Sequence, residues 1–145
     1  MSRTSNVIGN RMILAVDIRK VWDTVVDGLR EVAHQTDAEW RPEDIYHAVL
    51  SGKSFLFMDS SDPESFVVLS EYKHPYLAER VMIVDIAYNK TGDAIDRYQE
   101  QMEDIAREAG CAFIEFSSPR MGFKRVAEKH GYETVCTIYR KKLNG

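Results

Sequence analysis

The sequence is poor in the features that mark secreted, membrane-bound and metal-binding proteins. Its only two cysteines, Cys111 and Cys136, form no C-x-x-C motif and have no histidine at metal-ligand spacing. We therefore predict two reduced core cysteines, no metal site and an intracellular protein. No apolar run approaches the roughly 20 residues that span a bilayer, and the polar N-terminus lacks the apolar core of a signal peptide. These absences predict a cytoplasmic protein without a membrane partner.

The chain also lacks internal repeats, low-complexity tracts and linkers between domains. Its 145 residues are 44% hydrophobic and 29% charged, which is ordinary for a globular protein. A chain of this length can bury a core without disulfides or metals. We therefore predict a single domain that covers residues 1–145.

Basic residues are concentrated near the C-terminus of an otherwise acidic chain. Residues 120–142 contain seven lysines and arginines and two acids, whereas the rest of the chain contains 12 basic and 21 acidic residues. This distribution favours a local anion-binding site. It argues against a nucleic-acid partner, because the acidic remainder has no basic groove interleaved with aromatic residues.

Four segments show the apolar spacing of helices, with glycine or capping residues at their ends. They are Ile18 to about Gln35 (after Asp17 as N-cap), a segment that begins near Arg41–Asp44 and stops at Ser51–Gly52, Thr91–Gly110 and Met121–His130. The third helix has a single apolar stripe, which we expect to face a sheet. The stripe consists of Ile95, Tyr98, Met102, Ile105 and Ala109.

Six apolar segments rich in β-branched and aromatic residues predict strands. They are Arg11–Val16, Ser54–Met58, Ser65–Tyr72, Arg80–Tyr88, Cys111–Phe116 and Tyr132–Leu143. Short connections predict antiparallel neighbours, with a turn at residues 59–64. The helix between Arg80–Tyr88 and Cys111–Phe116 predicts one parallel pair. The fold class is therefore α/β (α+β): a mixed, mostly antiparallel sheet flanked by helices, in the order β-α-α-β-β-β-α-β-α-β.

The stretch Val81–Tyr98 organises this arrangement. It reads as a buried strand, a short polar turn containing Gly92, and the start of a helix. The first turn of a helix has unpaired backbone N–H groups and the positive end of the helix dipole. This stretch therefore predicts a phosphate-binding site.

The element order and two motifs resemble the GNAT superfamily of acyl-CoA N-acyltransferases. The turn Asn89–Ala94 is similar to the family's Q/R-x-x-G-x-G/A motif, with matches at Gly92 and Ala94. The segment Glu128–Tyr132 (E-K-H-G-Y) is similar to the family's E-K-x-G-F before its last strand. The resemblance implies an acyl-CoA co-substrate, acetyl-CoA by preference, and an amine acceptor. It implies that CoA is held by Ile86, Ala87, Thr91, Gly92, Asp93, Ala94, Ile95, Ser117 and Lys124.

Asp85 is the candidate general base for such a reaction. It is a lone carboxylate in the apolar strand V-M-I-V-D-I-A-Y, where many family members carry an acid. Burial would raise its pKa and suit it to proton transfer near neutrality. The alternative is a structural Asp bonded to a backbone amide or to an arginine such as Arg80. The resemblance implies that the oxyanion donor is an amide of Ile86 or Ala87, where the strand diverges from its neighbour.

Three positions depart from the family pattern. Asn89 replaces the usual Gln or Arg, and Asp93 places a negative charge in the phosphate-binding turn. Ala127 stands where many members carry a tyrosine that donates a proton to the CoA thiolate. Tyr132 and Tyr139 are alternative donors. The phrase F-S-S-P-R and the compact N-terminal half also resemble small GNAT-like proteins of tailed bacteriophages.

Two functions follow from these residues. The first is transfer of an acetyl group from CoA to an amine. The second is a non-catalytic GNAT-fold protein with a structural or interaction role, for example a phage virion component that contacts other virion proteins. Gly92, Ala94 and Asp85 favour the first function, whereas Asn89, Asp93 and Ala127 favour the second.

Overall fold

Helix and strand boundaries follow the apolar pattern of the sequence closely. The computed structural model describes residues 12–118 and 122–143. In chain order, its elements are β1 (Ile13–Ala15), α2 (Ile18–Thr36), α3 (Pro42–Leu50), β2 (Ser54–Asp59), β3 (Asp62–Lys73), β4 (Arg80–Tyr88), α4 (Ala94–Glu108), β5 (Cys111–Glu115) and α5 (Phe123–Lys129). None of these helices is long and apolar enough to cross a membrane.

The five strands form one sheet in the order β1-β2-β3-β4-β5. Neighbouring strands are antiparallel except β4 and β5, which are parallel and joined by α4. A crossover helix is what a parallel pair requires. The mixed, mostly antiparallel sheet and its one parallel pair are thus confirmed.

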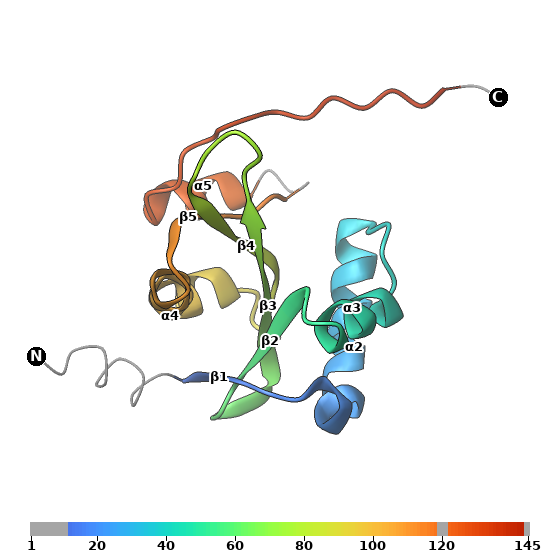
Figure 1. Ribbon diagram of the computed structural model, residues 1–145. Helices are drawn as coiled ribbons and strands as arrows, with labels where there is room; N and C mark the ends of the chain where they lie inside the picture. The colour runs from blue at the N-terminus through green and yellow to red at the C-terminus, as the bar shows by residue number, and fades with distance from the viewer. Residues whose placement is uncertain (1–11, 119–121, 144–145) are drawn as a thin grey trace, which may run out of the picture.

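Helices cover both faces of the sheet (Figure 1). On one face, α4 buries Ile95, Tyr98, Met102 and Ile105 against the sheet, with Ala109 packed at the rim. The predicted stripe of α4 is therefore confirmed. Burying such a stripe supplies most of the stability of a helix in a protein.

The opposite face is covered by α2 and α3. Val25 and Leu29 of α2 pack against Phe66 of β3 and against Tyr88 of β4. Gly28 lies between them, where an added Cβ would meet ring atoms of Phe66 and Tyr88 at 2.8 Å. The helix can therefore lie this close to the sheet only because residue 28 has no side chain.

A buried carboxylate links the sheet to α4. Asp59, at the end of β2, accepts hydrogen bonds from Tyr98 Oη (2.5 Å) and from the Ser61 hydroxyl (2.7 Å), and Arg97 Nε lies 3.8 Å away. Burial alone would raise the pKa of Asp59, but these hydrogen bonds favour its ionised form and hold the pKa below its ordinary value. Buried charges require such partners.

Several predicted boundaries are corrected. The turn between β2 and β3 is only Ser60–Ser61, because Asp62 to Glu64 already belong to β3. Helix α4 begins at Ala94 rather than Thr91, since Asp93 is its N-cap. Arg11, Pro119, Arg120 and Met121, which belong to the predicted first strand, turn and last helix, lie outside the described residues.

The largest correction concerns the C-terminus. The predicted closing strand Tyr132–Leu143 does not form: this segment has no regular structure and runs away from the sheet (Figure 1). Cys136 is consequently exposed rather than in the core, although both cysteines are free as predicted. The strand at Cys111–Phe116 ends at Glu115 and is only partly covered, not buried.

Candidate functional site

The candidate site is a cleft where β4 and β5 diverge. Their pairing runs from Arg80 opposite Cys111 to Ile83 opposite Glu115, and no further pair follows in the part of the chain that the structure describes. Beyond that point a cavity of about 130 Å³ opens between the ends of the two strands. Its walls are Val84–Tyr88 of β4 and the following Asn89, Phe116–Ser118 after β5, Val32, Gln35 and Thr36 of α2, Gly92, Ala94 and Ile95 around the start of α4, and Phe123 of α5.

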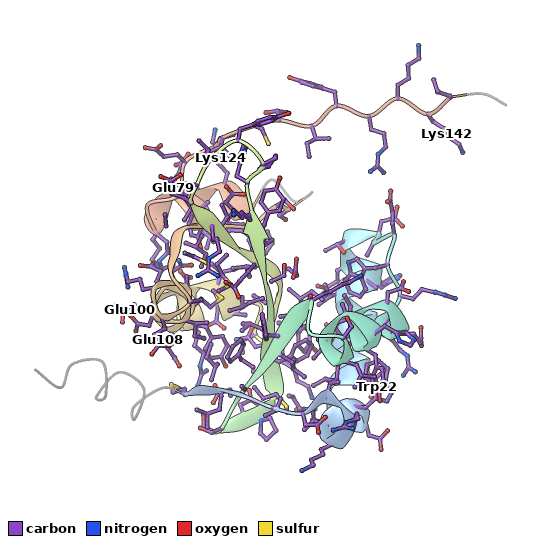
Figure 2. The ribbon with its side chains drawn as sticks, in the orientation of Figure 1. Trp22, Glu79, Glu100, Glu108, Lys124 and Lys142 are labelled. Carbon is purple, nitrogen blue, oxygen red and sulfur yellow. The ribbon has the colours of Figure 1, made fainter. Side chains whose placement is uncertain are left out.

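Most residues predicted for the site line this one cleft. Those in its wall are Asp85, Ile86, Ala87, Gly92, Ala94, Ile95 and Ser117. Thr91, Asp93 and Lys124 lie outside the lining, the first two in the turn before α4 and the third on the exposed face of α5 (Figure 2). The fold therefore brings the end of β4, the turn at Gly92 and Ser117 together at one place, although Ser117 is distant from the other two in the sequence.

Asp85 is the extra residue of a β-bulge. Val84 pairs with Leu69 and Ile86 pairs with Val68, which leaves Asp85 without a partner in β3. A bulge bends its strand and redirects the side chain at that point. In this chain it directs a carboxylate into the wall of the cleft without breaking the apolar alternation on either side.

The surroundings of Asp85 favour a proton acceptor. The residue is exposed on the cleft wall, yet the protein around it excludes enough water to raise the pKa of its carboxyl group. A hydrogen bond from the Ser70 hydroxyl opposes this rise. Arg80, the structural partner considered above, instead donates to the Ala109 carbonyl and lies 3.4 Å from Glu71.

The turn between β4 and α4 is held by its own side chains. Gly92 has φ = +78°, a conformation that favours glycine, and its N–H donates to the Asn89 carbonyl at 3.3 Å. The Asp93 N–H donates to Asn89 Oδ1 at 3.0 Å. The Asp93 carboxylate accepts from Asn89 Nδ2 (2.5 Å) and from Thr91 Oγ1 (2.6 Å). Two of the predicted phosphate-binding amides thus already have acceptors within the turn.

Helix α4 begins just after this turn and presents further donors. Its first backbone hydrogen bond runs from the Arg97 N–H to the Asp93 carbonyl. The N–H groups of Ala94, Ile95 and Asp96 therefore have no acceptor in a preceding helical turn. Together with the helix dipole, they form the part of this site that fits a phosphate group.

The charges near the turn are mixed. Hydrogen bonds from Thr91 and Asn89 hold the pKa of Asp93 below its ordinary value, so its carboxylate stays ionised and repels an anion. Lys90 Nζ lies 3.1 Å from Glu64 Oε2 and forms an ion pair with that carboxylate. Lys124 is exposed on α5 (Figure 2) and has no carboxylate within salt-bridge distance among the described residues. Among these three charged residues, Lys124 is the cation that no described carboxylate neutralises.

The tyrosines around the cleft are already hydrogen-bonded. Tyr88 lines the cleft and donates its hydroxyl to Glu31 Oε2 at 2.5 Å. Burial and this carboxylate raise the pKa of Tyr88 to about 12. Tyr132 donates to Gln99 Oε1 at 2.9 Å, and burial raises its pKa too. Tyr139 lies in the C-terminal segment, and 90% of it is exposed. Ala127 offers no hydroxyl on α5.

Sequence reasoning missed one wall of the cleft. Val32, Gln35 and Thr36 belong to the last turns of α2, and Phe123 begins α5. Helical periodicity shows which side of α2 is apolar, but not which strand end that side meets. Ser70 was also missed, because its contact with Asp85 depends on the bulge. Within residues 12–118 and 122–143, no group of three or more His, Cys, Asp or Glu residues is arranged to hold a metal ion.

Comparisons with known proteins reveal similarity of fold only. No protein-family profile matches the chain, and no curated protein matches its sequence. Three solved structures illustrate the match. One is described as a probable acetyltransferase (TM-score 0.71, 14% identity, 93% of this chain and 100% of that one).

The second is a ribosomal-protein-alanine N-acetyltransferase from Brucella melitensis biovar Abortus 2308 (TM-score 0.67, 14% identity, 90% and 97% covered). The third is an acetyltransferase from Trypanosoma brucei (TM-score 0.65, 12% identity, 90% and 98% covered). The chain therefore has the fold of these acetyltransferase structures over nearly its whole length. The resemblance to bacteriophage proteins stays a prediction.

Proposed function

We propose that this protein is an acyl-CoA-dependent N-acyltransferase that transfers an acetyl group to an amine. The observation that carries the proposal is the cleft between β4 and β5, which joins a bulged carboxylate, a free strand edge and a helix start. The similarity to acetyltransferase structures supports it at the level of fold. The acceptor belongs to the broad class of primary amines.

Different groups of the cleft would bind different parts of the co-substrate. The N–H groups of Ala94, Ile95 and Asp96 would bind the pyrophosphate, with Lys124 near the remaining phosphate charge. Among the described residues, the β4 edge beyond Ile83 has no neighbouring strand on the β5 side, so its backbone groups are available to the amides of the pantetheine arm. Gly92 lets a ligand approach the backbone closely, since nothing lies within 4 Å of its missing Cβ.

Asp85 would act as the general base. An amine that is protonated in water must lose a proton before its lone pair can attack a thioester carbonyl. The Asp85 carboxylate accepts that proton, directly or through one water molecule. Because its pKa is raised, it holds the proton more readily than an ordinary aspartate. The carbon–sulfur bond breaks as the amide bond forms, and the sulfur leaves as a thiolate.

A backbone amide would stabilise the developing oxyanion. Successive N–H groups of a strand point to opposite edges, so one of Ile86 and Ala87 faces β3 and the other faces the cleft. The one that faces the cleft is positioned to donate to the carbonyl oxygen as it gains negative charge. With alanine at position 127, the thiolate takes its proton from solvent.

A second function is favoured by specific observations. Asp93 keeps a negative charge in the turn, and Ala127 cannot donate a proton. Both features suit a GNAT-fold protein that has kept a ligand cleft or an interaction surface and lost catalysis. Such a protein would bind CoA or nothing in the cleft and would transfer no acetyl group.

Two measurements separate these functions. Acetyl-CoA at a hundredfold its dissociation constant should stabilise the native protein by about 2.7 kcal/mol, which raises the melting temperature by several degrees. Release of free CoA thiol is then followed with a panel of primary amines and, as control, without amine. Stabilisation with amine-dependent release supports the enzyme. Stabilisation without release supports the non-catalytic binder, and no stabilisation overturns CoA binding altogether.

A further inference from the structure

The C-terminal segment, residues 132–143, has the sequence of a strand but pairs with none of the strands in the described part of the chain. Its large apolar residues are among the most exposed in the molecule: Val135 (76%), Ile138 (81%), Tyr139 (90%) and Leu143 (79%). It leaves α5 and continues past the loop between β3 and β4 into open space (Figure 1). Exposed apolar residues in an extended segment are typical of an interaction site.

The sheet has an unpaired edge at β5. Within the described residues, β5 pairs with β4 on one side only, so its other edge carries unpaired backbone groups. None of its five residues is buried, and 52% of Phe113 is exposed. Proteins normally protect such an edge, because it accepts any strand that reaches it. The free edge and the free strand are thus complementary in hydrogen bonding and in apolar surface.

Charge favours an antiparallel direction of pairing. Glu71 lies at the N-terminal end of β5, 3.9 Å from Cys111 Sγ, and forms an ion pair with Arg80. Glu79 precedes Arg80, the residue that pairs with Cys111, and Glu108 lies three residues before Cys111 in the sequence. The C-terminal segment ends in the basic run Arg140-Lys141-Lys142. Figure 2 shows Lys142 far from Glu79 and Glu108 of the same chain. An antiparallel strand on β5 would bring the basic run to these carboxylates.

Only the far end of the segment is held away from its own β5. At its start, the Tyr132 ring packs on Phe116, directly after β5 (ring centroids 4.9 Å apart), and its hydroxyl donates to Gln99 Oε1. Near its end, the Arg140 guanidinium donates a hydrogen bond to Glu39, in the connection between α2 and α3. Gly131, with φ = +82°, lies just before it as a hinge residue.

We propose that residues 132–143 of one copy add to β5 of a second copy as an antiparallel sixth strand, and that the exchange is reciprocal. The product is a twofold-symmetric dimer, in which each sheet is completed by the other chain. The strand that the sequence predicts at Tyr132–Leu143 then exists, but in the partner's sheet. The exchange covers the apolar residues of the segment and protects the open edge of β5.

The oligomeric state gives the first test. Size-exclusion chromatography with light scattering should give about twice the monomer mass of 16.7 kDa for the full chain. Thr137→Pro removes a backbone donor in the middle of the segment and should return the mass to that of a monomer. Thr137→Val, which suits a strand, is the matched control and should stay dimeric. Circular dichroism checks that both variants keep the parent's fold.

A cross-linking experiment distinguishes exchange from pairing within one chain. In an antiparallel register that places Cys136 opposite Ala112 of the second copy, Cys136 lies beside Cys111 of that copy. Cys111→Ser and Cys136→Ser variants with different tags are co-expressed and treated with a short bis-maleimide. Exchange predicts a covalent heterodimer that neither variant forms alone. A monomeric parent, an unchanged dimer in Thr137→Pro, or a cross-link only within single parent chains would each overturn the proposal.

Discussion

Ser70 and Asp85 are joined by a hydrogen bond in which the Ser70 hydroxyl donates to the carboxylate at the β4 bulge. Burial has the larger effect and raises the pKa of Asp85. The bond from Ser70 stabilises the ionised carboxylate and so lowers this pKa in part. Ser70→Ala should therefore raise the pKa of Asp85 further. Because the base must be deprotonated to act, the acidic limb of the kcat/KM–pH profile should move to higher pH. An unmoved limb would mean that another group titrates there.

The glycine turn offers a matched pair of variants for CoA binding. Gly92 and Gly52 both have positive φ with nothing within 4 Å of the missing Cβ, but only Gly92 lines the cleft. Asparagine tolerates this conformation better than other non-glycine residues. The new side chain of Gly92→Asn would keep the pyrophosphate from the amides at the start of α4. Acetyl-CoA binding should therefore weaken by about tenfold or more, as expected for losing one hydrogen bond to a charged group. Isothermal titration should show unchanged affinity in Gly52→Asn; equal losses in both variants would point to strain alone.

The buried Asp59 should make stability depend on pH through Tyr98. Removing the Tyr98 hydroxyl by Tyr98→Phe should cost about 1–3 kcal/mol of unfolding free energy at neutral pH. Hydrogen bonds hold the pKa of Asp59 below 3.8, so their contribution is present above that pH and is lost as the pH falls through the folded-state pKa. The difference between variant and parent in denaturant unfolding should shrink accordingly. Tyr76→Phe makes the same change on an exposed side chain and should be neutral.

Gly28 should be required for the packing of α2. Gly28→Ala gains up to about 1 kcal/mol of helix propensity. Its new methyl group, however, would meet the rings of Phe66 and Tyr88 at 2.8 Å, and overpacking of this kind costs about 1–3 kcal/mol. We expect a net loss of stability in thermal unfolding. Gly122→Ala, where nothing lies within 4 Å, is the control, and an equally stable Gly28→Ala protein would show that α2 can shift outward.

The fold could be predicted from the sequence where local pattern and tertiary structure agree. The α4 stripe, for example, specifies one buried face, and a helix of that length between two apolar strands requires a parallel crossover. The closing strand could not be predicted from the same kind of pattern. Alternation in residues 132–143 indicates a strand, but it does not say which edge, or which chain, that strand pairs with.

The site could be predicted only in part for a similar reason. Gly92 and Asp85 stand out by residue type in their segments. The bulge that turns Asp85 into the cleft comes from a one-residue shift between Val68 and Leu69, which no periodicity reveals. The reciprocal hydrogen bonds between Asn89 and Asp93 are likewise visible only once the turn is folded. They explain how a carboxylate can occupy a turn that resembles a phosphate site.

Turnover of Asp85→Asn tests the central claim most directly. The amide is nearly isosteric, and residue 85 is not among the groups proposed to bind the phosphates, so acetyl-CoA affinity should stay within a few-fold of the parent. Turnover should fall by roughly 10²–10⁴, the usual contribution of a positioned general base. The acidic limb of the pH profile should vanish with it, whereas Asp23→Asn, on α2 outside the cleft wall, should leave turnover unchanged. Full turnover in Asp85→Asn, with the acidic limb intact, would contradict the assignment of Asp85 as the base.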